Sequence, residues 1–287
     1  MGTADELLIR DLTAADVGAA VALATDAGFR DRTRFYDFVM RTPTCRPIVG
    51  VLDDRVAATG LATANGPVGW LGGIVVDAEY RRHGIGRAIT EDLVRRLRAA
   101  GCLTLSLEST DAGRPLYERL GFRLATHYHQ LQADRVDEAP AQPEGTRVRR
   151  LEAADLPAVF ELDRQATAED RSAALASLAI PGAGEVAGWV LLRDEAIAGF
   201  LLPAERAYGA IVAPRFEDGL YLLDLHRYVV SPGGHVRAGI PDEHLAAWHR
   251  LQESGWQETW QAPRYLLGPD IPWRPAWIWG QINSAMG

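Results

Sequence analysis

The fold is decided by the stretch Trp70-Leu-Gly-Gly-Ile-Val-Val-Asp-Ala-Glu-Tyr-Arg-Arg-His-Gly-Ile-Gly-Arg-Ala88 of this 287-residue chain. Its apolar first part, up to Val76, predicts a buried strand, because the run is short, β-branched and bounded by polar residues. The polar segment Arg81–Gly86 predicts a short loop, and the residues after it predict a helix. Strand, loop and helix in this order are typical of an α/β unit that binds a ligand at the helix start.

Glycine and arginine gather in this loop. Gly84 and Gly86 let the backbone approach a ligand closely, and the N–H groups at a helix start form a site for an anion. Arg81, Arg82 and Arg87 add positive charge beside those groups. The loop is therefore expected to hold a phosphate or a pyrophosphate.

Other interpretations of the loop remain open at this point. A tight turn between strand and helix would also use two glycines. A P-loop is excluded, because it requires lysine and all 30 basic residues of the chain are arginine. A dinucleotide site expects a third glycine where Ala88 and Ile89 stand, although the next strand does end in an acidic residue, Glu108.

Composition excludes several classes of function. The 38 acidic residues outnumber the 30 basic ones, giving a net charge of -8, which argues against a nucleic-acid-binding protein and mildly favours a cationic partner. The two cysteines, Cys45 and Cys102, and the scattered histidines show no spacing typical of a metal site. No signal-like segment and no run of ~18 apolar residues occurs, so we expect a cytoplasmic protein without a membrane partner.

The chain repeats itself. Ile9–Val17 aligns with Val148–Leu156, which places Arg10 on Arg149, an offset of 139 residues. The same offset brings two further matches into register, one of which places Asp31 on Asp170. Matches in one register indicate a duplication. The sequence therefore predicts a first domain at 1–132, a polar, proline-containing linker at 133–145 and a related second domain at 146–287.

Each copy is predicted to begin with a strand and two helices, followed by further strands. Strands that come first and then alternate with helices favour an α/β (α+β) class, in which each domain has a mixed, mostly antiparallel sheet flanked by helices. In the first copy the expected strands are Leu7–Arg10, Pro47–Leu52, Val56–Ala64, Val68–Val76, Leu103–Glu108 and Phe122–Gln132, and the expected helices are Ala14–Ala27, Arg32–Arg41, Gly84–Ala100 and Gly113–Leu120.

Two motifs together resemble a known family. Arg81-x-x-Gly84-x-Gly86 is similar to the acetyl-CoA signature of the GNAT superfamily of N-acetyltransferases, and Leu116-Tyr-x-x-x-Gly-Phe122 is similar to an element that its members carry downstream. The tandem arrangement and the ending Trp273–Gly287 resemble two-domain members of that superfamily. The resemblance implies an N-acetyltransferase that uses acetyl-CoA and no metal, with an amine of a small molecule or of a protein as acceptor.

The resemblance also implies roles for individual residues. The backbone of Ile74, Val75 and Val76 would pair with the pantetheine amides, and the pyrophosphate would be held by Arg81, Arg82, His83, Gly84, Ile85, Gly86, Arg87 and Ala88. The amine would attack the thioester directly. Tyr117 would protonate the departing thiolate, although simple packing against Phe122 is the alternative. Glu108 is the candidate general base, and an exposed carboxylate at a strand end is the alternative.

The second copy lacks these features. The strand expected near Tyr208 is not followed by Arg-x-x-Gly-x-Gly, and Leu251 stands where the first copy has Tyr117. We therefore expect a degenerate second domain that completes the acceptor side, with the aromatic tail from Pro272 docked between the domains. Two rival functions remain: a non-catalytic sensor that binds acyl-CoA, and a nucleotide-binding enzyme.

Overall fold

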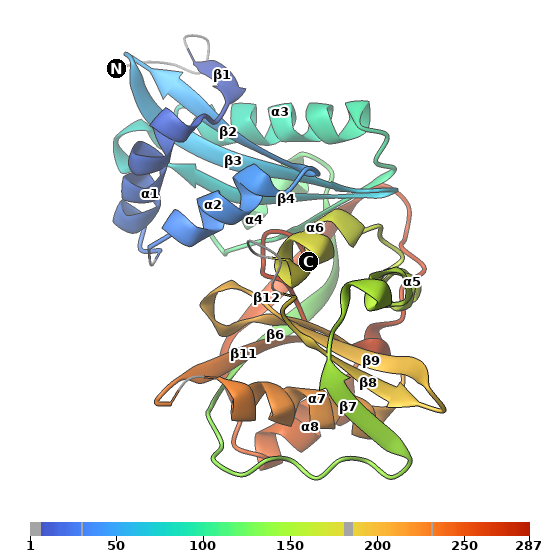
Figure 1. Ribbon diagram of the computed structural model, residues 1–287. Coiled ribbons are helices and arrows are strands. Elements are labelled where there is room, and N and C mark those ends of the chain that lie inside the picture. The colour runs from blue at the N-terminus through green and yellow to red at the C-terminus, as the bar shows by residue number, and fades with distance from the viewer. Residues whose placement is uncertain (1–6, 30, 181–185, 231) are drawn as a thin grey trace.

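The computed structural model describes residues 7–29, 31–180, 186–230 and 232–287. It contains two β-sheets flanked by helices (Figure 1). The elements of the first half are β1 (Leu8–Asp11), α1 (Val17–Asp26), α2 (Thr33–Arg41), β2 (Cys45–Leu52), β3 (Arg55–Asn65), β4 (Val68–Val76), α3 (Ile85–Ala99), β5 (Thr104–Glu108), α4 (Arg114–Arg119) and β6 (Arg123–Asp134). The predicted elements of this half are all found, with ends displaced by a few residues at most.

The second half repeats this order. Its elements are β7 (Thr146–Arg150), α5 (Leu156–Thr167), α6 (Ser172–Ala179), β8 (Trp189–Arg193), β9 (Ala196–Pro203), β10 (Gly209–Val212), α7 (Phe216–Val229), β11 (His235–Pro241), α8 (Leu245–Glu253), β12 (Gln257–Leu267) and β13 (Ile278–Gly280). One mixed, mainly antiparallel sheet and one antiparallel sheet, with helices beside them, confirm the predicted fold class. No helix within the described ranges is long and apolar enough to cross a lipid bilayer.

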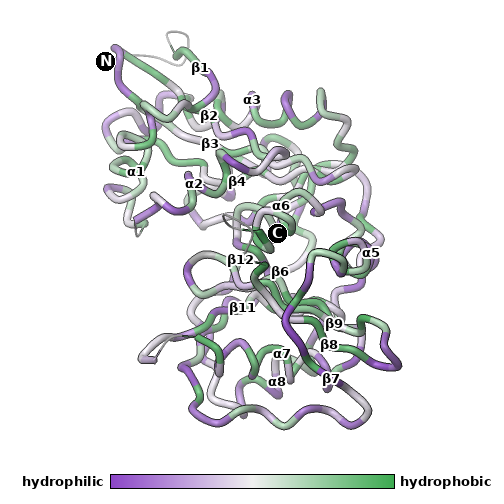
Figure 2. The backbone as a smooth tube through the Cα atoms, in the orientation of Figure 1, coloured by the Kyte–Doolittle hydropathy of each residue, from purple (hydrophilic) through white to green (hydrophobic). Residues whose placement is uncertain are grey.

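Apolar residues at helical spacing place α3 on the sheet. Ile85, Ile89, Leu93 and Leu97 are all fully buried, and the tube of α3 alternates between green and purple in Figure 2, as a helix with one buried face should. The helix can approach closely because Gly60 has no side chain: a Cβ there would lie 3.0 Å from both the Ile89 and the Leu93 side chains. Burial of each such aliphatic side chain contributes about 1.5–3 kcal/mol, so α3 is held firmly over β3 and β4.

Strands β4 and β5 separate toward their carboxyl ends. Among the strand pairs of the described residues, they alone run parallel, and their register ends where Trp70 lies opposite Ser106. Beyond that point β4 pairs only with β3, through a bulge in which Gly73 and Ile74 oppose the single residue Gly60. Gly73 has φ 58°, a conformation that glycine adopts without strain. The bulge bends β4 away from β5 and leaves one edge of β4 open.

The strands β6 and β12 each pair with strands of the other half within the eight-stranded sheet. The order β1-β2-β3-β4-β5-β12-β6-β11 places β12 against β5 and β6 against β11. This exchange is not anticipated in the sequence analysis, because β6 and β12 carry the same kind of strand pattern and either could pair with either edge. We propose the boundaries 1–132 and 146–287 as the limits of the duplicated units, with β6 and β12 crossing between them.

The C-terminal tail, from Pro272 onward, occupies the position in the second half that corresponds to the open edge of β4 in the first half. Strand β13 pairs with β10, so that Ile211 lies opposite Gly280. Trp279 is buried, donates its indole N–H to the Ala213 carbonyl and packs directly on Gly219, where a Cβ would lie 2.0 Å from its ring. The tail also reaches the first half, because Ala285 packs on the open part of β4. It therefore contacts both halves.

Candidate active site

A cavity of about 320 Å³ lies where β4 and β5 separate. Its walls come from both halves of the chain: α1 and α2, the open part of β4, the end of β5, and α4 on one side, and the β9–β10 turn, β11, β12 and the tail on the other. Of the residues predicted from sequence, Ile74, Val75, Glu108 and Tyr117 line this cavity. The structure thus brings the two candidate catalytic side chains to one space.

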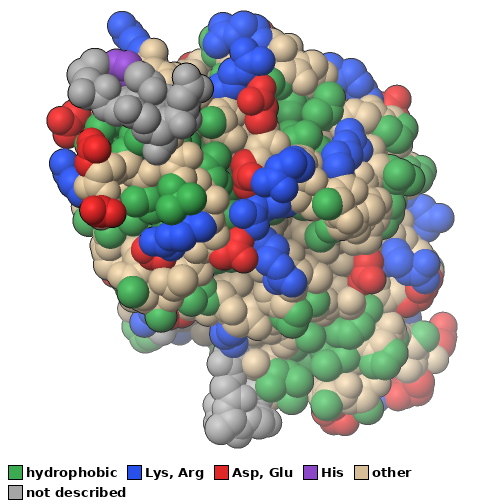
Figure 3. All heavy atoms as spheres, turned by 90° about the horizontal axis from the view of Figure 1, so that it is seen from above, with side chains coloured by type: hydrophobic (Ala, Val, Ile, Leu, Met, Phe, Trp, Pro, Cys, Tyr) green, Lys and Arg blue, Asp and Glu red, His purple; other side chains and the backbone are tan. Residues whose placement is uncertain are grey.

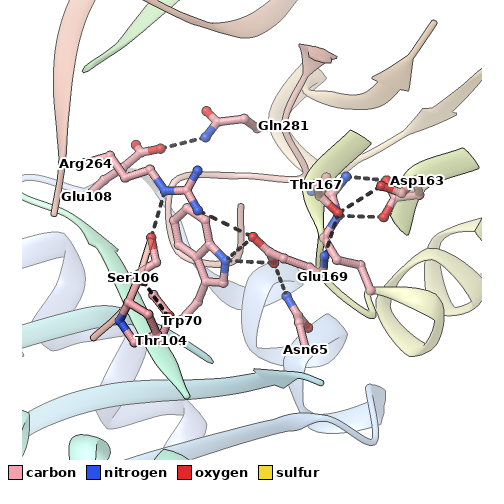
Figure 4. Close-up of polar contacts among 12 residues, drawn as sticks. Asn65, Trp70, Thr104, Ser106, Glu108, Asp163, Thr167, Glu169, Arg264 and Gln281 are labelled. Carbon is pink, nitrogen blue, oxygen red and sulfur yellow. Dashed lines mark hydrogen bonds and ion pairs between the residues drawn. The ribbon is translucent and has the colours of Figure 1, made fainter. Parts of the chain in front are cut away.

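Glu108 is the last residue of β5 and is partly buried. One carboxylate oxygen accepts a hydrogen bond of 2.7 Å from Gln281 Nε2 (Figure 4). The other oxygen lies 3.4 Å from Gln130 Nε2. Burial raises the pKa of Glu108 to about 7, although hydrogen bonds from Gln281 and Ser284 and the positive charge of Arg264 act in the opposite direction. At neutral pH the carboxyl group therefore exchanges readily between its two protonation states.

Tyr117 lies on α4 with its ring edge against Phe122, the ring centroids being 6.0 Å apart. Burial raises the pKa of Tyr117 to about 12, so its hydroxyl stays protonated at neutral pH. Within the described parts of the chain, that hydroxyl has no hydrogen-bond partner. The contact with Phe122 that the sequence suggested is present, and it leaves the side chain facing the cavity.

A chain of amides and a phenol connects Glu108 to the second half. Gln130 donates to Gln281 Oε1 at 2.9 Å, and the Tyr208 hydroxyl donates to Gln130 Oε1 at 3.1 Å. The sequence did not indicate that Gln130, Gln281 and Tyr208 belong to the site. Gln130 reaches the site because β6 is exchanged, and Gln281 because the tail docks there, so neither carries a local signal.

Arg264, on the exchanged strand β12, is buried beneath the site. Its Nε donates to Ser106 Oγ at 2.9 Å, and its guanidinium lies 4.7 Å from the centre of the Trp70 ring (Figure 4). The Glu169 carboxylate from the second half lies 3.5 Å from Arg264 and accepts from the Trp70 indole N–H at 2.9 Å. Burial raises the pKa of Glu169, while Arg264 lowers it. This buried cluster joins the two halves directly under the point where β4 and β5 separate.

The loop after β4 has the geometry of an anion site. Gly84 is the N-cap of α3 with φ 82°, and Arg82 has φ 66°. The first helical N–H groups, from Ile85 to Arg87, have no backbone partner among the described residues. His83 Nδ1 is buried and also has no hydrogen-bond partner in the parts of the chain that are described. An oxyanion placed here would satisfy these donors.

The side chains predicted to surround that anion are arranged unequally. Arg81 donates from Nε to the Val76 carbonyl at 3.1 Å, and Arg87 pairs with Glu91 at 2.8 Å. Arg81, Arg82 and Arg87 are exposed, whereas Ile85 is fully buried in the core. None of the residues from 81 to 88 is among those that line the 320 Å³ cavity; they follow the open edge of β4 at its far end.

The molecular face seen in Figure 3 carries blue, red and green side chains in mixture. On α3 itself, Arg96 pairs with Asp92 at 2.5 Å and with Asp11 on β1.

Within the described ranges, no group of three or more His, Cys, Asp or Glu side chains is placed to hold a metal ion.

The equivalent place in the second half is closed. The edge of β10 that corresponds to the open edge of β4 is paired with β13. Helix α7 begins without a glycine cap, and its first turn holds the buried carboxylate of Asp218, which accepts two hydrogen bonds from Arg193 at 2.7 and 3.0 Å. Leu251 is buried at the position of Tyr117, and the Trp256 N–H bonds its carbonyl as the Phe122 N–H bonds that of Tyr117. The described part of the second half therefore has no counterpart to the open edge, the glycine cap or Tyr117 of the first half.

Comparisons with known proteins agree with this geometry. A model described as "Acetyltransferase (GNAT) family" matches residues 11–122. The chain is similar to a glucosamine 6-phosphate N-acetyltransferase of Trypanosoma brucei brucei, with 35% identity over 132 residues that cover 44% of this chain and 84% of that protein.

Two solved structures share the whole fold. A putative acetyltransferase from Pyrococcus horikoshii has a TM-score of 0.78 and 20% identity, covering 98% of this chain and 96% of the other. A tandem GNAT protein from the clavulanic acid biosynthesis pathway has a TM-score of 0.64 and 17% identity, covering 92% and 100%. From the family match and the relative, the chain belongs to the GNAT family of N-acetyltransferases, and it shares its two-sheet fold with these two structures.

Proposed function

We propose that this N-acetyltransferase transfers the acetyl group of acetyl-CoA to an amine by direct attack, in the cavity between β4 and β5. The observation that carries the proposal is that Glu108 and Tyr117 line one cavity beside the open edge of β4. The donor enters along that edge, and the acceptor enters from the side that the second half walls.

The donor site uses backbone more than side chains. The open edge at Ile74, Val75 and Val76 is free to pair with the pantetheine amides as an added strand would. The pyrophosphate lies at the start of α3, where the N–H groups after Gly84 and the exposed Arg81 and Arg82 face it, with Arg87 and His83 beside them. The orphaned His83 Nδ1 supports this assignment, because a buried donor or acceptor without a partner is costly unless a ligand satisfies it.

Glu108 acts as the general base. A pKa of about 7 is well matched to removing a proton from the amine near neutral pH, since the carboxylate is both present and basic enough. The amine lone pair forms the new C–N bond at the thioester carbonyl, Glu108 takes the amine proton, and a backbone N–H of the bulge at Gly73–Ile74 stabilises the oxyanion. The C–S bond then breaks and CoA leaves.

Tyr117 stabilises the departing sulfur. A CoA thiol has a pKa of roughly 8.5, and the Tyr117 pKa of about 12 lies above it. The phenol therefore acts chiefly by donating a hydrogen bond to the developing thiolate rather than by giving up its proton completely. This refines the acid role that the sequence motif implies.

The test is to incubate the protein with acetyl-CoA and a panel of amines. Turnover is measured as the thiol released from acetyl-CoA. We expect Tyr117→Phe to lower kcat by about 100-fold and to leave CoA affinity unchanged, because the hydroxyl serves only the reaction. The matched control is Tyr221→Phe, which removes the hydroxyl of another buried tyrosine, on α7 and outside the cavity.

Two results would contradict the proposal. Tight CoA binding without turnover of any amine would identify a sensor. In calorimetry, stronger binding of ATP or NAD than of CoA would identify a nucleotide enzyme.

A further inference from the structure

Positive charge predominates on the wall of the active cavity. The charged side chains that line it are Arg32, Arg206, Arg237 and Glu108. Three arginines thus face one carboxylate, and the carboxylate is the group proposed to act as base. The charge of the cavity has the opposite sign to that of the whole chain, which is -8.

Two of the arginines lie on the acceptor side. Arg237, on β11, lies with its guanidinium carbon 5.9 Å from the centre of the Tyr208 ring and donates to Gln132 Oε1 at 3.3 and 3.4 Å. Arg206 is close enough to Tyr208 to lower its pKa, as Arg237 also does, against the raising effect of burial. Tyr208 is joined through Gln130 to the base. The two guanidinium groups therefore stand on the second-half side of the cavity, beside Tyr208.

The backbone holds Arg206 in an unusual conformation. Arg206 and Ala207 have φ 58° and 65°, in the left-handed region that costs a non-glycine residue roughly 1–2 kcal/mol. Two consecutive left-handed residues also form the turns at Asp53–Asp54 and Asp194–Glu195, so this conformation belongs to the tight turn between β9 and β10. Among the described side chains, none forms a hydrogen bond or ion pair with the Arg206 guanidinium. Its side chain lines the cavity beside Tyr208.

Arg32 contributes charge from the first half. It caps α2 and lies over the rings of Phe29 and Phe35, at 4.8 and 4.9 Å. The cavity therefore has cationic groups on both walls, with aromatic surface between them.

We propose that the acceptor is a small amine that also carries an oxyanion, a phosphate or a carboxylate, which Arg206 and Arg237 bind while the amine faces Glu108. This inference rests on the proposed function. Arginine pairs bind such anions with two parallel hydrogen bonds. A purely cationic amine would be repelled here, and the negative charge of the whole chain does not compensate, because salt screens charges beyond about 8–10 Å.

The experiment compares matched amines that differ in the anion. Phosphoethanolamine is set against ethanolamine, and alanine against alaninamide, with thiol release as the measurement. We expect the wild-type kcat/KM to favour the anionic member of at least one pair by about ten-fold or more. Which pair shows the preference distinguishes phosphate from carboxylate.

Arginine variants locate the effect. Arg206→Gln and Arg237→Gln are each expected to lower the ratio of kcat/KM for the preferred anionic amine to that for its neutral partner by about ten-fold or more. Turnover of the neutral amine also shows that the variant is folded. The control is Arg215→Gln, an exposed arginine before α7 that does not line the cavity.

The outcomes separate the two proposals. Acetylation of neutral amines as fast as, or faster than, anionic ones overturns this inference and leaves the acetyltransferase function in place. A rise in the KM for acetyl-CoA alone in the arginine variants also overturns it, because the arginines would then serve the donor. Failure to acetylate any amine, with CoA bound tightly, overturns both.

Discussion

At the scale of single residues, Glu108 should control the pH dependence of the reaction. Its pKa of about 7 predicts that kcat/KM rises between pH 6 and pH 8, as the carboxyl group loses its proton and becomes a base. We expect Glu108→Gln to lower kcat by about 100-fold or more and to remove this rise. The measurement is the pH–rate profile of both proteins, and Glu253→Gln, at the exposed end of α8, is the control.

Through the same residue, Glu108, an increase in pH should lower the stability of the folded protein while it raises kcat/KM. A carboxyl group whose pKa is raised in the folded protein favours the folded state while protonated, so that stability falls as pH increases from about 4.5 to about 7. Glu108→Gln should lack this fall. Equal pH dependence of the melting temperature in both proteins would show that Glu108 is not desolvated in the folded state.

Some residue-scale features were predictable because the chain is duplicated. Arg10 binds Asp16 with two hydrogen bonds of 2.7 and 2.8 Å, and Arg149 binds Asp155 with two of 2.6 and 2.8 Å. The repeated sequence indicated that Arg10 and Arg149 occupy equivalent positions, and the two ion pairs agree with that alignment. The bond from Gln281 to Glu108 was not predictable, because it joins residues 173 positions apart through the docking of the tail.

At the scale of elements, α3 offers a direct test of the anion site. Gly84 at its start and Gly101 just after its end both have positive φ, 82° and 88°. Alanine at either position should cost a similar free energy of unfolding, about 1 kcal/mol. Only Gly84→Ala should also weaken CoA binding, by about ten-fold, because it disturbs the N–H groups that face the pyrophosphate. Calorimetric titration with CoA measures this, and equal weakening by Gly101→Ala would argue against the assignment.

Elements whose signal is local were predicted well from sequence. The helix that follows β4 was expected from one segment, and it begins one residue later than predicted, at Ile85. The pairing of strands is a different matter, since it depends on which edges meet in space. The strand Phe122–Gln132 was expected to complete the first sheet, and it does lie in that sheet, but β12 stands between it and β5. For this reason the residues that β6 and β12 bring to the site were not predicted from the sequence.

At the scale of the whole molecule, the exchange of strands makes the two halves depend on each other. Strand β6 is hydrogen-bonded to β11 and to β12, and one hydrophobic cluster contains Phe35 and Leu61 from the first half together with Val190 and Ile282 from the second. An isolated half would expose this surface and leave strand edges unpaired. The second half therefore has a structural role, because it completes the sheet and the core of the first.

This dependence predicts the result of cutting the chain. A protease site inserted after Glu138, in the exposed linker segment, should allow cleavage without loss of structure, since the residues from 135 to 145 form no strand or helix. We expect the cleaved halves to remain one particle in size-exclusion chromatography and to retain acetyltransferase activity, and to separate only in denaturant. Each half expressed alone should be unfolded or insoluble. Separation of two folded halves under native conditions would show that the exchanged strands do not hold the molecule together.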